Sequence, residues 1–518
     1  MTRSRAAHWP DMPWLGSIIA VLVWEGLAHV LADTFVLAGP TAILGYLYDN
    51  AGLMSRALAE TLGNAVAGFI IGNLAAVLLA VIATVWPRSD AMVRGLALVV
   101  FCLPLVATGP ILRVVFGPGD GPQIVLAALA VYYTTLIPLL VGLRAVPAGW
   151  LDLVHSYGRG RWAALVHVRA RAALPYFIAG LQIAAPAAFL GAMVGEFTGA
   201  ERGMGVLTIR AMRAMNVEMT WALAVVATVV AVAGFWAIGW IARRFMQGEP
   251  PVILSPPRAD RRGNAVLALL GIVAVLLLVW WGGLKILGIS PFFAKGPVEV
   301  FDALFLAPDA PLVRATLRTA LAETAMFLLP GYAAGLGAGA LLAMLIVLVP
   351  KVAGTAMPLA IALRSVPIIT TAPLVVLVTG RGAVGTITLV AIMVFFPTFV
   401  ACLHGLSQAP GQVVDVMRSY AARPLTVLVR VQVPAMLPAF FAAARMNVPA
   451  SVLAVTVVEW LATGNGIGSL MALSASQSDY DMLWSAVVLV AVLSALGYAS
   501  VGWLERRVMA TYAPEQLQ

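Results

Sequence analysis

Long apolar runs, separated by short segments that contain arginine, make up most of this 518-residue chain. An apolar run of about 20 residues is long enough to cross the hydrocarbon core of a bilayer as a helix. The pattern predicts about 12 transmembrane helices, near 14–33, 59–86, 91–116, 123–143, 172–198 and 220–243, then near 264–289, 321–349, 353–379, 385–407, 435–462 and 482–505. We therefore expect an all-α membrane protein.

The second half of the sequence repeats the first at an offset of 263 residues. The tetrapeptide Leu-Ala-Glu-Thr at 58–61 recurs at 321–324, and Pro104 recurs as Pro367. Six spans per half is an even number, so both halves enter the membrane in the same direction. The repeats are therefore parallel, unlike the inverted repeats of many secondary transporters.

The domain organisation follows from this repeat. We expect a first half at 1–246, a cytoplasmic linker rich in proline and arginine at 247–263, and a second half at 264–518. The run at 14–33 is interpreted as a retained helix and not a signal peptide, because the similar run at 264–289 opens the second half from an internal position.

Arginine distribution sets the expected orientation. Every second loop is rich in arginine, as at Arg94, Arg159, Arg243 and Arg423, and the opposite loops are poorer. Short loops rich in lysine and arginine remain in the cytoplasm. We therefore place these loops, and both termini, on the cytoplasmic side.

Composition supports a membrane protein and excludes several other classes. Hydrophobic residues make up 62% of the chain and charged residues only 11%, whereas soluble domains carry about 25% charge. The net charge of +9 comes from clusters in loops and not from one amphipathic face, so nucleic acid is not an expected partner. The two cysteines, Cys102 and Cys402, lie in apolar runs and predict neither a disulfide framework nor a cysteine metal site.

The longest cytoplasmic loop of each half carries a recognisable pattern. In the second half, 415–421 reads Asp-Val-Met-Arg-Ser-Tyr-Ala, and 431–438 reads Val-Gln-Val-Pro-Ala-Met-Leu-Pro. This resembles the EAA loop of binding-protein-dependent permeases, the membrane subunits of ABC importers. The family pattern has an acidic residue, two small residues, a glycine six positions after the acid, and an apolar-x-Leu-Pro ending.

Both loops are degenerate copies of that pattern. Asp415 takes the acidic position, Ala421 the glycine position and Pro434 the proline position. In the first half Asp152 and Gly158 match, but Arg171 replaces the proline. The glycine position permits a tight turn, and the proline is expected to stop one helix before the next span begins.

The resemblance implies a type I ABC importer permease architecture in a fused tandem form, with two permease halves in a bacterial inner membrane. The segment Arg418-Ser419-Tyr420 and the later Glu459 look most like the sulfonate, taurine and nitrate branch of the family. In that family the loop lies in a groove of the ATPase. The residues that the resemblance assigns to ATPase coupling are Asp152, Ser156, Tyr157, Gly158, Asp415, Ser419, Tyr420, Ala421 and Pro434.

The chain contains no Gly-x-x-x-x-Gly-Lys-Ser/Thr phosphate loop. ATP hydrolysis is therefore expected on a separate chain, and this chain is not expected to be an enzyme or to hold a cofactor. The resemblance implies two ATPase subunits that bind ATP and Mg, and an extracytoplasmic solute-binding protein. The simpler alternative to ATPase coupling is that each of these two loops is a basic loop that only fixes the membrane topology.

Charged residues within apolar spans form a second group of candidates, because such charges are costly in a bilayer. Arg445, Arg364 and Arg113 fit a pathway for an anionic substrate, and Gln182 occupies the repeat position of Arg445. The alternative is that each arginine reaches the interface or pairs internally. Glu196 and Glu459, matched across the repeat, are expected either to cap and pair structurally or to act as a gate.

The function predicted is a permease subunit that forms the pathway for a small solute in an ATP-driven importer, with an anion such as a sulfonate or a nitrate-like nutrient as the candidate. The main alternative is an ion-coupled secondary transporter of major-facilitator-like architecture, but the basic loop typical of that family is not matched at 87–94. A membrane enzyme would need a convergent cluster of His, Asp or Cys side chains, which the sequence does not show. Substrate identity does not follow from the sequence.

Overall fold

The computed structural model describes residues 13–32, 37–117, 119–245, 265–349, 375, 379 and 382–512. Every element in these ranges is a helix. The first half contains α1 (Pro13–Val30), α2 (Pro40–Asp49), α3 (Ala51–Val85), η2 (Pro87–Ser89), α4 (Asp90–Phe101), α5 (Leu105–Phe116), α6 (Gly121–Arg144), α7 (Ala148–Ser156), α8 (Arg161–Ala164), η3 (Leu165–Arg169), α9 (Ala170–Phe197), α10 (Met204–Arg213) and α11 (Val217–Phe245).

Over its described residues, the second half has a similar order of helices. It contains α12 (Ala265–Ile286), α13 (Pro297–Phe301), η4 (Asp302–Leu306), α14 (Ala310–Leu348), α17 (Ala383–Ser407), α18 (Gly411–Ser419), α19 (Pro424–Val427), η6 (Leu428–Gln432), α20 (Val433–Val458), η7 (Glu459–Thr463), α21 (Gly466–Ser476) and α22 (Tyr480–Tyr512).

Within the described residues, eight helical segments are long and apolar enough to cross a membrane, and a bent pair brings the number to nine. An all-helical membrane protein is therefore confirmed, whereas twelve spans are not shown. α1 and α12 contribute shorter apolar stretches, Val21–Val30 and Leu270–Ile286. The expected span at 353–379 lies outside the described residues, apart from 375 and 379.

The expected span at 91–116 is not one continuous helix, because the chain bends by 94° between α4 and α5. Pro104 stands at the bend with φ −72° and ψ 103°, an extended conformation. Proline has no N–H to continue the α4 hydrogen bonds, and its ring disfavours helical geometry at Leu103. The result is two short helices at a sharp angle in place of one continuous helix.

Closely packed helix pairs form the centre of each half. Gly68 and Gly72 of α3 lie against α6, where an added Cβ at Gly68 would come within 2.4 Å of Ala127. Gly331 and Gly335 of α14 lie in the same way against α17. These glycines allow the backbones to approach as small residues do in other membrane proteins, so both halves have the same core.

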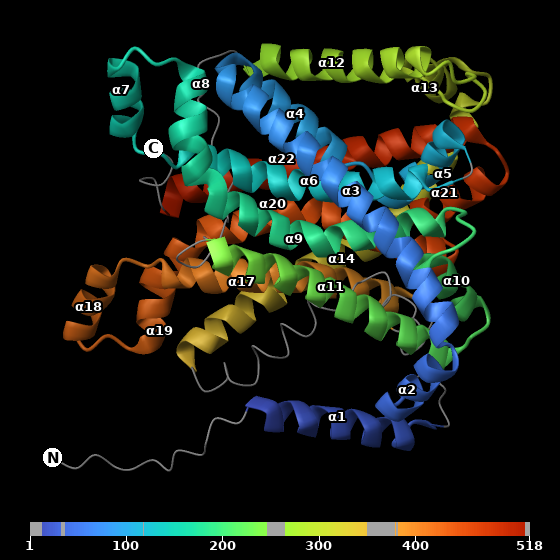
Figure 1. Ribbon diagram of the computed structural model, residues 1–518, viewed down its shortest axis with the longest axis horizontal. Coiled ribbons are helices and arrows are strands. Elements are labelled where there is room, and N and C mark those ends of the chain that lie inside the picture. Colours follow the sequence, from blue (N-terminus) through green and yellow to red (C-terminus); the bar gives the residue numbers. More distant parts are fainter. Residues whose placement is uncertain are drawn as a thin grey trace.

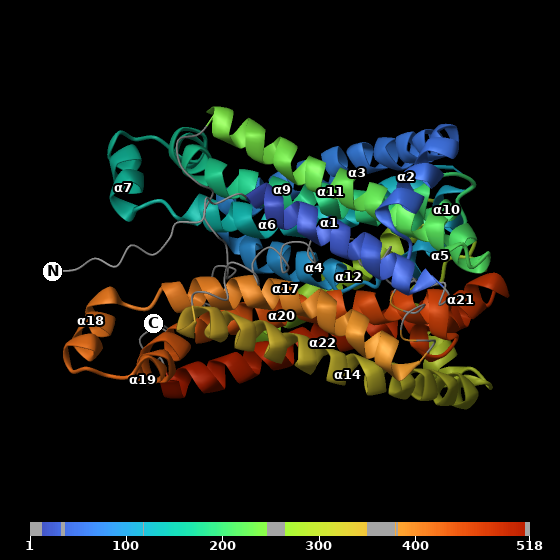
Figure 2. The same cartoon turned by 90° about the horizontal axis from the view of Figure 1, so that it is seen from below.

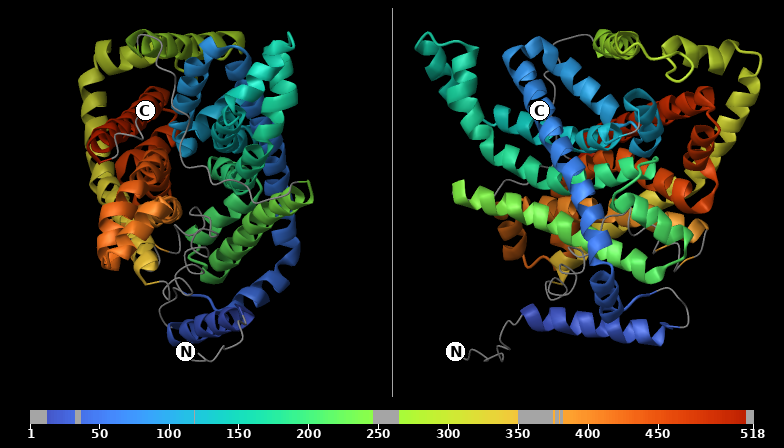
Figure 3. Two further views of the ribbon diagram at one scale, coloured as in Figure 1. Left: turned by 90° about the vertical axis from the view of Figure 1, so that its left-hand side faces the viewer. Right: turned by 45° about the vertical axis from the view of Figure 1, so that its right-hand side comes forward.

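The two halves lie side by side, with α3, α6, α9 and α11 on one side and α14, α17, α20 and α22 on the other (Figure 2). Buried apolar side chains join them: Ala107 and Ile111 of α5 share a cluster with Ile467 and Met471 of the second half. α1 and α12 occupy opposite outer sides of this core (Figures 1 and 3). The duplicated sequence therefore folds into two similar halves that pack together.

Candidate functional site

Each of the two EAA-like loops forms a short helix, a turn and a second short helix: α7 and α8 in the first half, α18 and α19 in the second. Both pairs project from the same end of the molecule (Figures 1 and 2). The two segments that the sequence analysis singled out therefore lie on one side of the helical core, as a joint partner on that side would require.

The turns of the two loops have the same hydrogen-bond pattern. In the first, the N–H groups of Gly158 and Arg159 donate to the carbonyl oxygens of His155 and Val154, at 2.9 and 3.2 Å. In the second, the N–H groups of Ala421 and Ala422 donate to Arg418 and Met417 at 2.9 and 3.0 Å. This pair of bonds ends many helices and places the residue after the cap in the left-handed region.

Gly158 and Ala421 occupy that left-handed position, with φ of 68° and 53°. The expected tight turn is thus present in both loops. Glycine adopts this backbone without cost, whereas the Cβ of alanine is crowded there. The second loop therefore holds the same turn with a strained residue.

The side chains assigned to ATPase coupling differ in how freely they project. Tyr157 and Tyr420 are 77% and 83% exposed. The hydroxyls of Ser156 and Ser419 instead donate to carbonyls one turn earlier in their own helices, at 2.8 and 2.7 Å. The tyrosines, and not the serines, are therefore the groups available to a partner.

The two aspartates are surface residues. Asp152 is exposed, and Asp415 lies 3.8 Å from Arg418 with both side chains more than 70% exposed. Ion pairs of this kind add little to stability because water screens them. Both carboxylates thus remain accessible.

The expectation that Pro434 ends a helix is wrong. The chain is helical from Pro424 to Leu461, and Pro434 lies within the first turn of α20. A π-helical segment, η6, precedes it, and η3 occupies the same repeat position in the first half. Such π-helical segments within α-helices are rare and occur frequently at functional sites.

Glu196 lies near the end of α9 and Glu459 follows the end of α20, and both cap the short helices that come next, α10 and α21. Glu196 Oε2 accepts a hydrogen bond from the N–H of Gly205 at 2.6 Å. Glu459 Oε2 accepts one from Gly468 at 2.8 Å. Both side chains are 1% exposed. Two roles were considered from the sequence, structural capping and gating. This geometry corresponds to structural capping.

Two threonines complete the same caps. The N–H of Met204 donates to Thr61 Oγ1 at 2.8 Å, and the N–H of Ile467 donates to Thr324 Oγ1 at 2.9 Å. Sequence reasoning missed both threonines, although they end the repeated Leu-Ala-Glu-Thr segments. That recurrence was the signal that could have found them.

Arg445 is paired inside the second half. Its guanidinium lies 3.2 Å from a carboxylate oxygen of Glu505 on α22 and 5.7 Å from the ring centroid of Tyr498. Both charged side chains are largely buried, at 18% and 11% exposure. Arg445 therefore matches the alternative of internal pairing and is not an uncompensated cation for an anionic substrate.

The other pathway candidates do not gather around Arg445. Gln182 lies against Gly239 of α11, where an added Cβ would come within 2.5 Å of its amide nitrogen. Arg113 lies beside Gly199, and Arg364 falls outside the described residues. Among the described residues, no interaction joins Arg113, Gln182 and Arg445 into one site.

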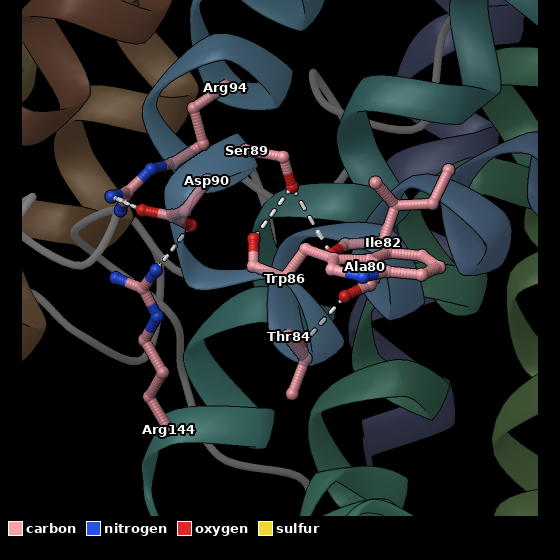
Figure 4. A network of polar contacts seen from close by, with 8 residues as sticks. All are labelled: Ala80, Ile82, Thr84, Trp86, Ser89, Asp90, Arg94 and Arg144. Carbon is pink, nitrogen blue, oxygen red and sulfur yellow. Dashed lines mark hydrogen bonds and ion pairs between the residues drawn. The ribbon is translucent and has the colours of Figure 1, made fainter. Parts of the chain in front are cut away.

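A further ion-pair cluster lies at the end of α6 that leads into α7. Arg94 and Arg144 pair with the two carboxylate oxygens of the buried Asp90 (Figure 4). From the sequence these arginines served only to fix topology. The repeat positions of Asp90 and Arg144 are Ala353 and Ser407, so this cluster belongs to the first half alone.

Comparison with known proteins supports the duplicated architecture. The model of the family "Binding-protein-dependent transport system inner membrane component" matches twice, over residues 72–247 and 335–510. The two matches are offset by 263 residues, the offset of the internal repeat. Together they cover more than half of the chain.

Individual relatives have the size of one half. A probable ABC transporter permease protein of Haemophilus influenzae is 28% identical over 229 residues, which cover 44% of this chain and 94% of that protein. The taurine transport permease of Escherichia coli is 25% identical over 240 residues, or 46% and 87%. The formylaminopyrimidine transport permease of Halalkalibacterium halodurans is 25% identical over 231 residues, or 45% and 90%.

The repeated family match, the paired helix–turn–helix loops and the apolar helices agree. The chain belongs to the family of binding-protein-dependent transport system inner membrane components: it is a multi-pass inner-membrane ABC transporter permease with a tandem domain repeat, and it is not a catalytic subunit.

Proposed function

We propose that this chain forms both halves of the translocation pathway of an ATP-driven importer and binds two ATPase subunits through its two coupling loops. The observation that carries the proposal is the duplicated loop: two helix–turn–helix segments with the same turn geometry project from the same end of the molecule. ATP and Mg bind the partner ATPase, since this chain has no phosphate loop.

The proposed topology has twelve spans, a first permease half at 1–246, a linker at 247–263 and a second half at 264–518, with both termini cytoplasmic. The arginine-rich loops and the coupling loops would then share the cytoplasmic side. α10 and α21 would lie on the opposite side, where an extracytoplasmic solute-binding protein delivers its cargo.

The proposed substrate is a small solute, with an anion such as a sulfonate or a nitrate-like nutrient as the first candidate. Support comes from the relatives named for taurine and aliphatic sulfonate transport. Relatives named for formylaminopyrimidine and riboflavin transport widen the range to heterocyclic solutes. Arg113, Gln182 and Arg364 remain candidate pathway residues, whereas the ion pair with Glu505 makes Arg445 the weakest of the group.

Co-purification tests ATPase binding. The tagged chain is co-expressed with the ABC ATPase gene of its genomic neighbourhood and purified in detergent, as wild type and as Tyr157→Ala/Tyr420→Ala. Loss of the ATPase from the double variant supports the proposal. Tyr48→Ala is the matched control, because Tyr48 is equally exposed at 85% but lies on α2, at the other end of the molecule.

The outcome that contradicts the proposal is a wild-type chain that retains no ATPase and moves solute down an ion gradient when reconstituted alone. That result would favour the secondary transporter. Sidedness is tested separately in a variant without Cys102 and Cys402, both of which are buried. Ser156→Cys should react with a membrane-impermeant maleimide only from the cytoplasmic side, and Ser476→Cys only from outside.

A further inference from the structure

The two coupling loops expose apolar side chains at the same four repeat positions. Residues exposed on the first loop are Trp150, Leu153, Tyr157 and Trp162, and their counterparts on the second loop are Val413, Val416, Tyr420 and Leu425. Each of these side chains is at least 45% exposed. Each loop thus presents an apolar surface that the other described residues leave exposed.

The net charge from aspartate and arginine does not distinguish the two surfaces, although the arginines lie at different repeat positions. Each loop carries one aspartate and two arginines: Asp152, Arg159 and Arg161 in the first, and Asp415, Arg418 and Arg423 in the second. The backbone turns are also alike, as their matching hydrogen bonds show. Electrostatic attraction and loop shape would therefore bring both loops to the same kind of groove.

Side-chain size does distinguish them. At two of the four positions the loops are similar, with leucine opposite valine and tyrosine opposite tyrosine. At the other two, Trp150 and Trp162 are 64% and 62% exposed, whereas their counterparts Val413 and Leu425 are 45% and 59% exposed and much smaller. Tryptophan is enriched among residues that dominate binding energy, whereas valine and leucine are under-represented there.

We infer that the two coupling loops are not equivalent: α7–α8 is the dominant anchor for an ATPase subunit, through Trp150 and Trp162, and α18–α19 docks more weakly. This inference rests on the proposed function, because it concerns the same ATPase surface. A groove that accepts two tryptophan rings is underfilled by valine and leucine, and the unfilled volume loses packing contacts. ATPase subunits therefore bind this chain in two steps of unequal affinity.

Exchanging the side chains between the loops tests the inference. The full chain is embedded in nanodiscs and titrated with the ABC ATPase that co-purifies with the wild type. Wild type should show two binding steps that differ by about tenfold or more, the size expected of a hot-spot residue. Trp150→Val/Trp162→Leu should weaken the tighter step by about tenfold, and Val413→Trp/Leu425→Trp should strengthen the weaker step. Trp236→Leu, an equally exposed tryptophan of α11 at 65%, should change neither step.

Two results would overturn the inference, and they are distinguishable. If wild type binds two ATPase subunits with equal affinity, or the exchanged variants stay within twofold of it, the loops are equivalent and the proposed function stands. If no ATPase binds the wild-type chain, the proposed function fails and this inference with it. Each variant is checked for monodisperse elution, so that misfolding is recognised separately.

Discussion

Ala421 occupies a backbone conformation that glycine adopts far more readily. Its φ of 53° lies in the left-handed region, and Gly158 has φ 68° at the same position of the first loop. An L-residue with a Cβ pays about 1–2 kcal/mol there, which the greater chain entropy of glycine partly offsets. The turn of the second coupling loop is therefore less stable than the turn of the first.

Substitution at this position should change how often each turn opens, and the change should have opposite directions in the two loops. Gly158→Ala should destabilise the first turn by about 1 kcal/mol, and Ala421→Gly should stabilise the second by up to about 1 kcal/mol. The measurement is the rate of trypsin cleavage at Arg159 and Arg423, divided by the rate in the denatured chain. A change of about fivefold corresponds to 1 kcal/mol, and equal rates in variant and wild type would show that the turn carries no strain.

The Arg445–Glu505 pair should show energetic coupling, because breaking it leaves one largely buried charge without its partner. Arg445→Gln introduces the residue that the first half carries at Gln182, and Glu505→Gln removes the acid. In thermal unfolding of the detergent-purified protein, the stability losses of the two single variants should add up to more than the loss of the double variant. The difference, about 1–3 kcal/mol, is the coupling energy of the pair.

Transport by the same variants separates the two roles considered for Arg445. If the arginine only pairs with Glu505, Arg445→Gln/Glu505→Gln should transport with unchanged apparent affinity for substrate. Additive stability losses together with a large rise in KM would instead restore Arg445 to the substrate pathway.

At the scale of elements, α10 and α21 begin with N–H groups held by side chains of the preceding helical segment and of a helix distant in sequence. Thr324 and Glu459 supply the acceptors for α21, and Thr61 and Glu196 supply them for α10. A helix start needs such acceptors because its first N–H groups have no partner within the helix. Each cap therefore ties a short outer helix to the centre of its half.

Thr324→Val keeps the shape of the side chain and removes this acceptor. It should destabilise the protein by about 1 kcal/mol, since the buried N–H of Ile467 loses its partner. Thr319→Val is the matched control, because Thr319 is exposed and its hydroxyl bonds only within its own helix, to Ala315. Equal unfolding midpoints for the two variants would show that the cap adds nothing.

Asp90 joins α4 to the end of α6, next to the first coupling loop. Asp90→Asn leaves Arg94 and Arg144 facing each other without the carboxylate, so we expect a loss of about 1–3 kcal/mol and weaker coupling of ATP hydrolysis to transport. The measurements are the unfolding midpoint and the ratio of solute moved to ATP hydrolysed in proteoliposomes. Asp481→Asn is the control, because its half-exposed ion pair with Lys295 lies at the start of α22, outside both loops; an unchanged ratio in Asp90→Asn would remove the cluster from the coupling mechanism.

At the scale of the whole molecule, the halves are held together by buried apolar clusters, such as the one that joins α5 to α21 and α22. A covalent link is not needed to form such an interface. We therefore expect that the two halves still assemble when the linker at 247–263 is removed and 1–246 and 264–518 are co-expressed as separate chains. A tag on one half should then retain the other, and transport should persist. If the halves fail to co-purify while each is inserted in the membrane, the linker itself is required for assembly.

The sequence by itself determined the helical membrane architecture, the parallel repeat and the position of both EAA-like loops. These features are encoded by neighbouring residues: apolar runs set the spans, and the residues around Gly158 and Ala421 set the turns. The duplication made each of them visible twice. The bend between α4 and α5 is also set locally, at Pro104, but the sequence analysis expected one uninterrupted span there.

Only the tertiary structure decided which buried charges are paired. Arg445 meets Glu505, and Asp90 meets Arg144, from different helices. Such pairs depend on how each helix is rotated and which neighbour it packs against, which apolar periodicity does not specify. Glu505 also lies next to basic residues in the last helix, and its repeat counterpart is the uncharged Ala242. The sequence therefore did not indicate it as a buried partner of Arg445. The sequence therefore placed the charges along the chain, and helix packing decided which of them are compensated.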